Sequence, residues 1–179
     1  YDVNRMGFSQ LVEWYILKQA LQFNEIAPNK PDYNDITKRR LQTYQGAFVY
    51  EPKPGLYKDI VVFDFRSLYP TIIGSHNIGP DTINCACCRE TSQAMPAGEN
   101  ERNWFCAKKK GFIPILIEDL ITRRMRIKEI IREKNDEKFT FLDARQNSLK
   151  LLANSFYGYL GIFGARWYSI ECARSVTAW

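Results

Sequence analysis

The sequence predicts a mixed α+β fold, and three features of the 179 residues carry this prediction. Apolar residues recur at helical intervals in residues 8–23 and in two long segments, 113–135 and 141–158. Residues 58–65 (KDIVVFDF) form a short β-branched and aromatic run, which is typical of a buried strand. Hydrophobic residues make up 45% of the chain, which is enough to build a core.

The remaining segments are a linker, an irregular stretch and one further helix. Ser9 is available as an N-cap for the first helix, and residues 24–35, with prolines and asparagines, are typical of a linker. We expect residues 79–111 to be irregular and residues 171–179 to be helical. The predicted parts are residues 1–43 (helix and linker), 44–112 (strand and cysteine-bearing loop), 113–158 (antiparallel helical hairpin) and 159–179 (a truncated end segment).

Composition and pattern exclude several classes of protein. With 25% charged residues the chain is neither collagen-like nor fully disordered, and its apolar runs are far shorter than the ~18 residues of a membrane-spanning helix. The first ten residues carry no secretory signal, so we expect a cytoplasmic protein and no membrane partner. No G-x-x-x-x-G-K-[ST] motif is present, so P-loop kinases and ATPases fit poorly.

The positive charge is concentrated in one segment. Lys and Arg outnumber Asp and Glu by 25 to 20, which gives a net charge of +5. Residues 108–134 hold nine basic and four acidic residues, so this segment alone carries the whole excess. Such a segment indicates a polyanionic partner, above all phosphates, although a solvated helix face is the alternative explanation.

Asp64 lies inside the apolar run, where burial of a lone carboxylate would be costly. A cation is therefore expected near it. Two partners remain open: a salt bridge to neighbouring Arg66, or a hard divalent ion such as Mg²⁺. The ion would take one or two carboxylates plus phosphate oxygens and keep several waters.

Residues 67–70 predict a turn into a helix, because Pro70 suits a first helical turn. Free backbone N–H groups at a helix start bind phosphate well. Asp64, the turn and the helix start thus predict a corner for a metal and a phosphate, with the ring of Tyr69 one helical turn from the ion.

The predicted hairpin supplies further cations. Arg124 and Lys128 share a face as an i, i+4 pair, and Lys150, Asn154 and Tyr157 share one on the second helix. We expect the three cations to converge at one height, with no acid on the inward faces. This arrangement would suit a triphosphate.

Four of the five cysteines, Cys85, Cys87, Cys88 and Cys106, bracket the irregular segment. Their spacing lacks the paired C-x-x-C knuckles of a well-defined zinc site, although His76 is available to complete one. In a reducing compartment such a group is metal-binding, redox-active or simply buried. A disulfide between Cys88 and Cys106 is a further alternative if the source is a hyperthermophile.

Two segments, DFRSLYPTII (64–73) and KLLANSFYG (150–158), resemble motifs A and B of family B DNA polymerases. Residues 44–47 resemble the Y-x-G-G/A link between exonuclease and polymerase regions, and residues 111–124 resemble the first fingers helix. The resemblance covers essentially the whole chain and is strongest to the archaeal branch. It implies part of a palm subdomain, over residues 44–112 and 159–179, with the fingers hairpin over residues 113–158.

The resemblance also implies roles for the residues singled out above. Asp64 would bind both catalytic Mg²⁺ ions, with the Phe65 carbonyl as a further ligand, and Tyr69 would be the steric gate against a 2′-hydroxyl. Tyr157 would pack beneath the templating pair. The implied nucleotide-binding set is Phe65, Arg66, Ser67, Leu68, Tyr69, Arg124, Lys128, Lys150, Asn154 and Tyr157. The implied catalytic group is Asp64, Tyr69 and Lys150.

The implied reaction is template-directed DNA synthesis, in which a primer 3′-oxygen attacks the α-phosphorus of a dNTP with two metal ions. The implied partners are primer–template DNA, dNTP, a sliding clamp and polymerase segments carrying motif C, the thumb and the exonuclease. The implied location is cytoplasmic and nucleoid-associated. No D-T-D of motif C occurs in the chain; we expect it downstream of Trp179, and we expect the chain to be inactive alone.

Cys88 and Cys106 resemble the positions of a loop disulfide in some archaeal relatives. A second such pair would fall at Ser169 and Cys172, where Ser169 breaks it. Two other functions stay open: a non-catalytic nucleotide- or DNA-binding module, and a zinc-stabilised interaction domain centred on residues 85–106.

Overall fold

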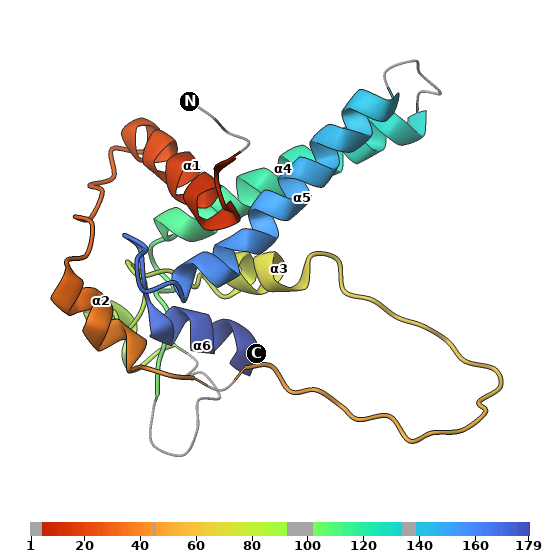
Figure 1. Ribbon diagram of the computed structural model, residues 1–179, viewed down its shortest axis with the longest axis horizontal. Helices are drawn as coiled ribbons and strands as arrows, with labels where there is room; N and C mark the ends of the chain where they lie inside the picture. Colours follow the sequence, from red (N-terminus) through yellow and green to blue (C-terminus); the bar gives the residue numbers. More distant parts are fainter. Residues whose placement is uncertain (1–4, 45, 93–101, 134–138) are drawn as a thin grey trace.

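The computed structural model describes residues 5–44, 46–92, 102–133 and 139–179. Within these ranges the chain is helical (Figure 1). The helices are α1 (Phe8–Gln22), α2 (Tyr33–Arg40), α3 (Leu68–Ser75), α4 (Phe112–Glu133), α5 (Phe139–Leu160) and α6 (Ile170–Ala178), with a short 3-10 turn η2 (Ala86–Cys88).

The long helices α4 and α5 lie side by side and project from the rest of the structure as an antiparallel pair (Figure 1). The two long predicted helices are therefore present. Helix α1 packs against the base of this pair, while α3 and α6 also contact α5. Among the described helices, none combines the length and the apolar character needed to cross a bilayer.

The core lies where these helices meet, at the base of the α4–α5 pair. Its buried side chains come from α1, α3, α4, α5 and α6, so each helix turns one apolar face inward. Burial of one such side chain stabilises the fold by about 1.5–3 kcal/mol. Fully buried members include Val12, Ile16, Ile73, Leu116, Ile117, Leu120, Phe156, Leu160 and Val176.

A polar tie fixes α1 to the end of α5. Glu13 on α1 accepts a hydrogen bond from the Tyr159 hydroxyl at 3.1 Å and one from Nε of Arg166 at 3.3 Å. Tyr159 is a buried core residue in the last turn of α5 and Arg166 follows that helix, so these bonds hold α1 against the end of α5.

The strand predicted at residues 58–65 does not form in the described part of the chain. Val62 is 85% exposed and Phe63 is 90% exposed. The segment between α2 and α3 runs outward as an open loop (Figure 1). A strand needs a neighbour for its N–H and C=O groups, and the described ranges offer only one isolated bridge, between Ile83 and Phe105. The β part of the α+β prediction is therefore not met by these residues.

Helix α2 lies partly inside the segment predicted as a linker. Its N-cap, Asp32, accepts a hydrogen bond from the backbone N–H of Asp35 at 2.8 Å. Three basic residues occupy its last turn, where their positive charges interact favourably with the negative end of the helix dipole. The prolines at 28 and 31 precede this helix, so the linker prediction was wrong for its last residues.

Candidate functional site

A pocket of about 710 Å³ lies between the turn that precedes α3 and the facing sides of α4 and α5. Its lining residues are Asp64, Phe65, Arg66, Ser67, Leu68, Tyr69, Arg124, Lys128, Lys150, Asn154, Ser155, Tyr157 and Gly158. Every residue that the polymerase resemblance assigned to a catalytic, Mg²⁺-binding or nucleotide-binding role lines this one pocket, whereas the candidate zinc ligands do not. The roles themselves stay predictions. Ser155 and Gly158 are additional lining residues that the sequence argument did not name.

The turn before α3 is built by a backbone conformation that is unusual outside glycine. Ser67 is the N-cap of α3 and has φ 52° and ψ 54°. Such a left-handed residue costs about 1–3 kcal/mol and persists only where its surroundings hold it. Thr71 provides that support, since its N–H donates to the Ser67 carbonyl at 2.9 Å and its hydroxyl donates to the Arg66 carbonyl at 3.0 Å. The predicted helix start is confirmed, with Pro70 in the first turn.

Arg124 links the two sides of the pocket. Its NH1 donates to Oγ of Ser67 at 3.3 Å, and its Nε donates to Oε1 of Gln146 on α5 at 3.1 Å. Gln146 is buried and is held in turn by Asp143, which accepts from its Nε2 at 2.9 Å. The part played by Gln146 was not predicted. The available signal was its position four residues before Lys150, on the same face of α5.

The cations of the pocket are close enough to perturb one another. The pKa of Lys128 is lowered, mainly by the Arg124 guanidinium, then by burial and by the charges of Arg132, Arg66 and Lys150. A lowered lysine pKa means that the positive charge is less favourable here than in water. The pocket is therefore an electropositive site, and a bound polyanion would offset the repulsion between its cations.

Two aromatic rings form the floor of the pocket. Tyr69 on α3 and Tyr157 on α5 stack with ring centroids 4.5 Å apart and an interplanar angle of 30°. The Tyr157 hydroxyl lies 3.1 Å from the hydroxyl of Tyr44. Burial, and then this hydrogen bond, raise the pKa of Tyr157, so its phenol stays protonated. The contact with Tyr44 was not predicted, although the Y-x-G-G/A resemblance had drawn attention to that residue.

Asp64 corrects one step of the sequence argument. Its side chain is exposed, because the predicted strand does not form, and it makes no ion pair with Arg66 among the described residues. Burial therefore does not demand a cation at Asp64. Asp64 and Phe65 line the same pocket as the cations, and a carboxylate and a backbone carbonyl are both hard oxygen donors. This donor set, with room for phosphate oxygens, fits Mg²⁺.

The cysteines lie outside this pocket. Cys85, Cys87, Cys88 and Cys106 come together, with all four sulfurs within 4.8 Å of one another. The Sγ atoms of Cys88 and Cys106 are 4.0 Å apart, and both thiols are free. An S–S bond measures about 2.05 Å, so the structure does not contain the disulfide considered above. His76 does not join them, because its ring stacks on Trp179 with centroids 3.8 Å apart.

Backbone donors act on two of these thiols. The N–H of Ala107 donates to Sγ of Cys88 at 3.4 Å and lowers the pKa of that thiol to about 6. The N–H of Lys109 donates to Sγ of Cys106 at 3.3 Å and lowers its pKa as well. Both hydrogen bonds favour the thiolate form.

Comparison with known proteins places this arrangement in a family. The sequence profile of DNA polymerase family B matches residues 3–179, so the chain belongs to that family. The resemblance seen in motifs A and B is thereby confirmed.

Its relatives include archaeal polymerases. The chain is 48% identical to DNA polymerase 1 of Pyrococcus abyssi and 49% identical to the DNA polymerase of Thermococcus sp. (strain 9oN-7), each over 181 residues. These alignments cover 100% of the chain, which spans 23% of the length of either relative. The solved family B DNA polymerase of Pyrobaculum calidifontis matches with a TM-score of 0.72 and 38% identity, over 97% of this chain and 22% of that one.

Proposed function

We propose that the chain supplies the dNTP-binding part of the active site of an archaeal family B DNA polymerase, which carries out template-directed DNA synthesis. One observation carries the proposal: a single pocket is lined both by Asp64 and by the cations Arg124, Lys128 and Lys150. The relatives named DNA polymerase support it, because they match the whole chain at nearly half identity.

The cations would hold the triphosphate of the incoming nucleotide. Arg124 and Lys128 reach the pocket from α4, and Lys150 reaches it from α5. Charge-assisted hydrogen bonds to phosphate are stronger than neutral ones, and a guanidinium can bind two oxygens at once. The backbone N–H groups of Ser67 and Leu68, at the start of α3, would add donors to the same group.

Asp64 and the Phe65 carbonyl would hold Mg²⁺ together with oxygens of the dNTP. When bound, two such ions supply charge stabilisation for the entering and leaving oxygens of nucleotidyl transfer. Asn154, exposed on α5, would donate its amide to the triphosphate and support the nascent pair. Arg66 lies on the same wall as Asp64 and would contribute to the field that attracts the nucleotide.

Tyr69 would select the sugar. Its ring is fixed from below by the stack with Tyr157, which is itself tied to Tyr44. A ring that cannot move aside would collide with a ribose 2′-hydroxyl. Tyr157 would lie beneath the templating pair, where the minor groove carries little sequence information and contact tests shape.

Other segments would complete the enzyme. We infer that motif C, the thumb and the exonuclease lie on further polymerase segments. Residues 58–65 would pair with palm strands of those segments. The chain would then be inactive alone. The exposed side chains of Val62 and Phe63 would be covered in that arrangement. Primer–template DNA would be the substrate, and a sliding clamp would be a further partner. The enzyme would act in the cytoplasm, at the nucleoid.

The change of Asp64 to Asn tests the proposal in the complete polypeptide that carries this chain. Asp64→Asn keeps the shape but removes the anionic ligand, so we expect nucleotide addition to fall by about 1,000-fold or more while primer–template binding is kept. Single-turnover primer extension and a DNA-binding titration measure the two effects.

Asp59→Asn is the matched control. It lies in the same exposed segment but outside the pocket, and asparagine tolerates its positive φ of 54°. This variant should extend primers at the normal rate. An Asp64→Asn enzyme that also does so would refute the metal role. A wild-type protein that binds dNTP and DNA but adds no nucleotide would favour the non-catalytic binding module.

A further inference from the structure

The sulfurs of the four cysteines of residues 85–106 cluster, and three of them are spaced as in a tetrahedral metal site. In a tetrahedron with metal–sulfur bonds of ≈ 2.3 Å, neighbouring sulfurs are about 3.8 Å apart. The Sγ atom of Cys87 lies 3.6 Å from that of Cys88 and 3.7 Å from that of Cys106, and Cys88 and Cys106 are 4.0 Å apart. Cys85 completes the set, with all four sulfurs within 4.8 Å of one another.

These distances distinguish a metal site from a disulfide. A disulfide would shorten one pair to about 2.05 Å and leave the other two sulfurs apart from it. The three separations among Cys87, Cys88 and Cys106 are nearly equal, and all four thiols are free. Four cysteine sulfurs are a ligand set of zinc in structural sites.

We propose that Cys85, Cys87, Cys88 and Cys106 bind one Zn²⁺ ion as a tetrathiolate site. The site does not depend on the proposed polymerase activity, because it shares no residue with the 710 Å³ pocket. Its ligands come from the η2 turn and from the strand-like segment that follows the loop, which the bridge between Ile83 and Phe105 aligns.

Hydrogen bonds around the sulfurs support the site. Backbone N–H groups of Ala107 and Lys109 donate to Cys88 and Cys106, as outer donors do around ligands of structural metal sites. The Cys85 carbonyl accepts from Nε1 of Trp104 at 2.8 Å, which fixes the backbone of the first ligand. Four thiolates around Zn²⁺ carry a net charge of −2, and Lys108 and Lys109 lie two and three residues after the last ligand, where their positive charges would oppose it.

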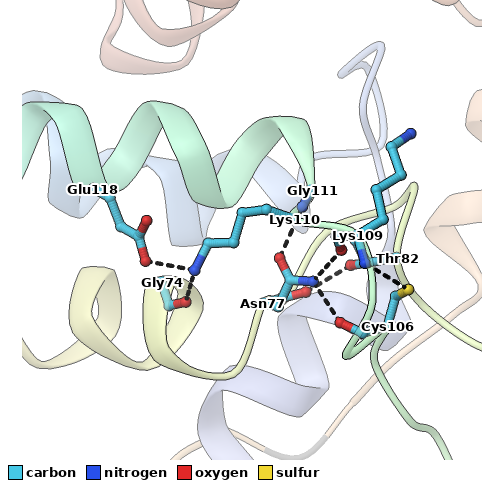
Figure 2. Close-up of polar contacts among 8 residues, drawn as sticks. All are labelled: Gly74, Asn77, Thr82, Cys106, Lys109, Lys110, Gly111 and Glu118. Carbon is cyan, nitrogen blue, oxygen red and sulfur yellow. Dashed lines mark hydrogen bonds and ion pairs between the residues drawn. The ribbon is translucent and has the colours of Figure 1, made fainter. Parts of the chain in front are cut away.

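The ion would clamp the cysteine-bearing loop to the start of α4. Figure 2 shows Cys106 beside Asn77, Lys109 and Gly111, in the connection that leads into that helix. The Cys106 carbonyl accepts from Nδ2 of Asn77 at 2.7 Å, and the Gly111 N–H donates to Oδ1 of the same side chain at 2.8 Å. A metal at Cys106 would therefore order the base of the helix that presents Arg124 and Lys128.

The test is the metal content of the complete polypeptide, purified under reducing conditions without a chelator or an immobilised-metal column. We expect Cys106→Ala to contain one zinc atom per chain fewer than wild type, as measured by inductively coupled plasma mass spectrometry. Cys172→Ala is the matched control, since Cys172 is buried in α6 away from the cluster, and it should keep the full zinc content. Equal zinc in wild type and Cys106→Ala would overturn the proposal.

Two further measurements keep the test decisive if Cys106→Ala does not fold. Cys85→Ala changes a less buried ligand and should also lose the zinc. X-ray absorption at the zinc edge of the wild-type protein should show zinc–sulfur distances of about 2.3 Å. Iron in place of zinc, or a peptide map with a disulfide between any two of the four cysteines, would overturn the assignment.

Discussion

Arg124 is the residue at which the two sides of the pocket meet. It bonds to Ser67 before α3 and to Gln146 on α5, and its charge is the main cause of the lowered pKa of Lys128. The crowding of cations has an energetic cost that a bound polyanion would remove. Ligand stabilisation therefore reports directly on this pocket.

Tripolyphosphate should raise the melting temperature of the complete polypeptide. A ligand at 100 times its Kd stabilises the native state by about 2.7 kcal/mol. We expect Arg124→Ala to lose most of this gain, measured against its own ligand-free baseline, because one of three converging cations is removed. Thermal unfolding with and without the ligand measures the gain.

Arg126→Ala is the control for that change. Arg126 lies on the same helix but is exposed and outside the pocket, so its variant should keep the gain. Equal stabilisation of the Arg124→Ala and wild-type proteins would place the polyanion elsewhere, for example on the lysines at 108–110.

Tyr69→Ala should admit ribonucleotides. Removal of the ring opens the space that a 2′-hydroxyl would need, and we expect discrimination between dNTP and rNTP to fall on the order of 10- to 200-fold. The ratio of kcat/KM for the two nucleotides measures it. Tyr33→Ala, an exposed tyrosine on α2, is the control. Unchanged sugar selectivity in Tyr69→Ala would remove the gate assignment.

For single residues, the sequence predicted which side chains line one pocket better than it predicted their burial and their hydrogen-bond partners. Helical spacing correctly predicted that Arg124, Lys128 and Lys150 face one space, because i, i+4 positions share a face. Asp64 was expected to be buried, and the structure exposes it. Gln146 was missed because a neutral amide carries no charge signal, so its bond to Arg124 emerges only when the helices are packed.

At the scale of elements, Asn77 joins the end of α3 to the start of α4. Figure 2 shows its side chain between the two segments, and Nδ2 also donates to the Lys109 carbonyl at 2.8 Å. The connection is tight, since a Cβ on Gly111 would lie 2.7 Å from Cγ2 of Thr82. Glycine is therefore required at that close approach.

Asn77→Ala should loosen this junction. It removes three side-chain hydrogen bonds, each worth about 1 kcal/mol, and puts alanine at a φ of 55°. We expect local unfolding to become easier by about 3 kcal/mol, which is about 100-fold faster amide exchange at residues 106–112. Hydrogen exchange measured by mass spectrometry checks this.

Asn34→Ala, on the exposed face of α2, should leave the same amides unchanged. If exchange at residues 106–112 is equal in Asn77→Ala and wild type, Asn77 does not hold the junction.

Elements with a strong local signal were predictable. Helices α1, α4, α5 and α6 lie within a few residues of their predicted bounds, because each carries apolar residues at helical spacing. Helix α2 was missed although Asp32 and Asp35 form a capping pair, since the preceding prolines dominated the interpretation. The strand predicted at residues 58–65 does not form, for another reason. Strand formation depends on pairing partners that the local sequence does not specify.

At the scale of the whole molecule, α1, α3 and α6 pack at the base of the α4–α5 pair, and this pair and the segment before α3 extend from that base (Figure 1). The pocket lies where these extensions leave the body, so its walls come from segments far apart in the sequence. The family was recognisable from two motifs, but the described residues contain no β-strand and do not confirm the α+β class. Fold class depends on long-range pairing, whereas motifs are local.

A crystal of the complete polypeptide with primer–template DNA, a non-hydrolysable dNTP and Mn²⁺ tests the pocket assignment most directly. We predict anomalous density for Mn²⁺ at the Asp64 carboxylate and a triphosphate in contact with Arg124, Lys128 and Lys150. The opposite result is a triphosphate bound at the separate cavity of about 570 Å³ lined by Lys108, Lys109 and Lys110, with no metal at Asp64. That result would contradict the assignment.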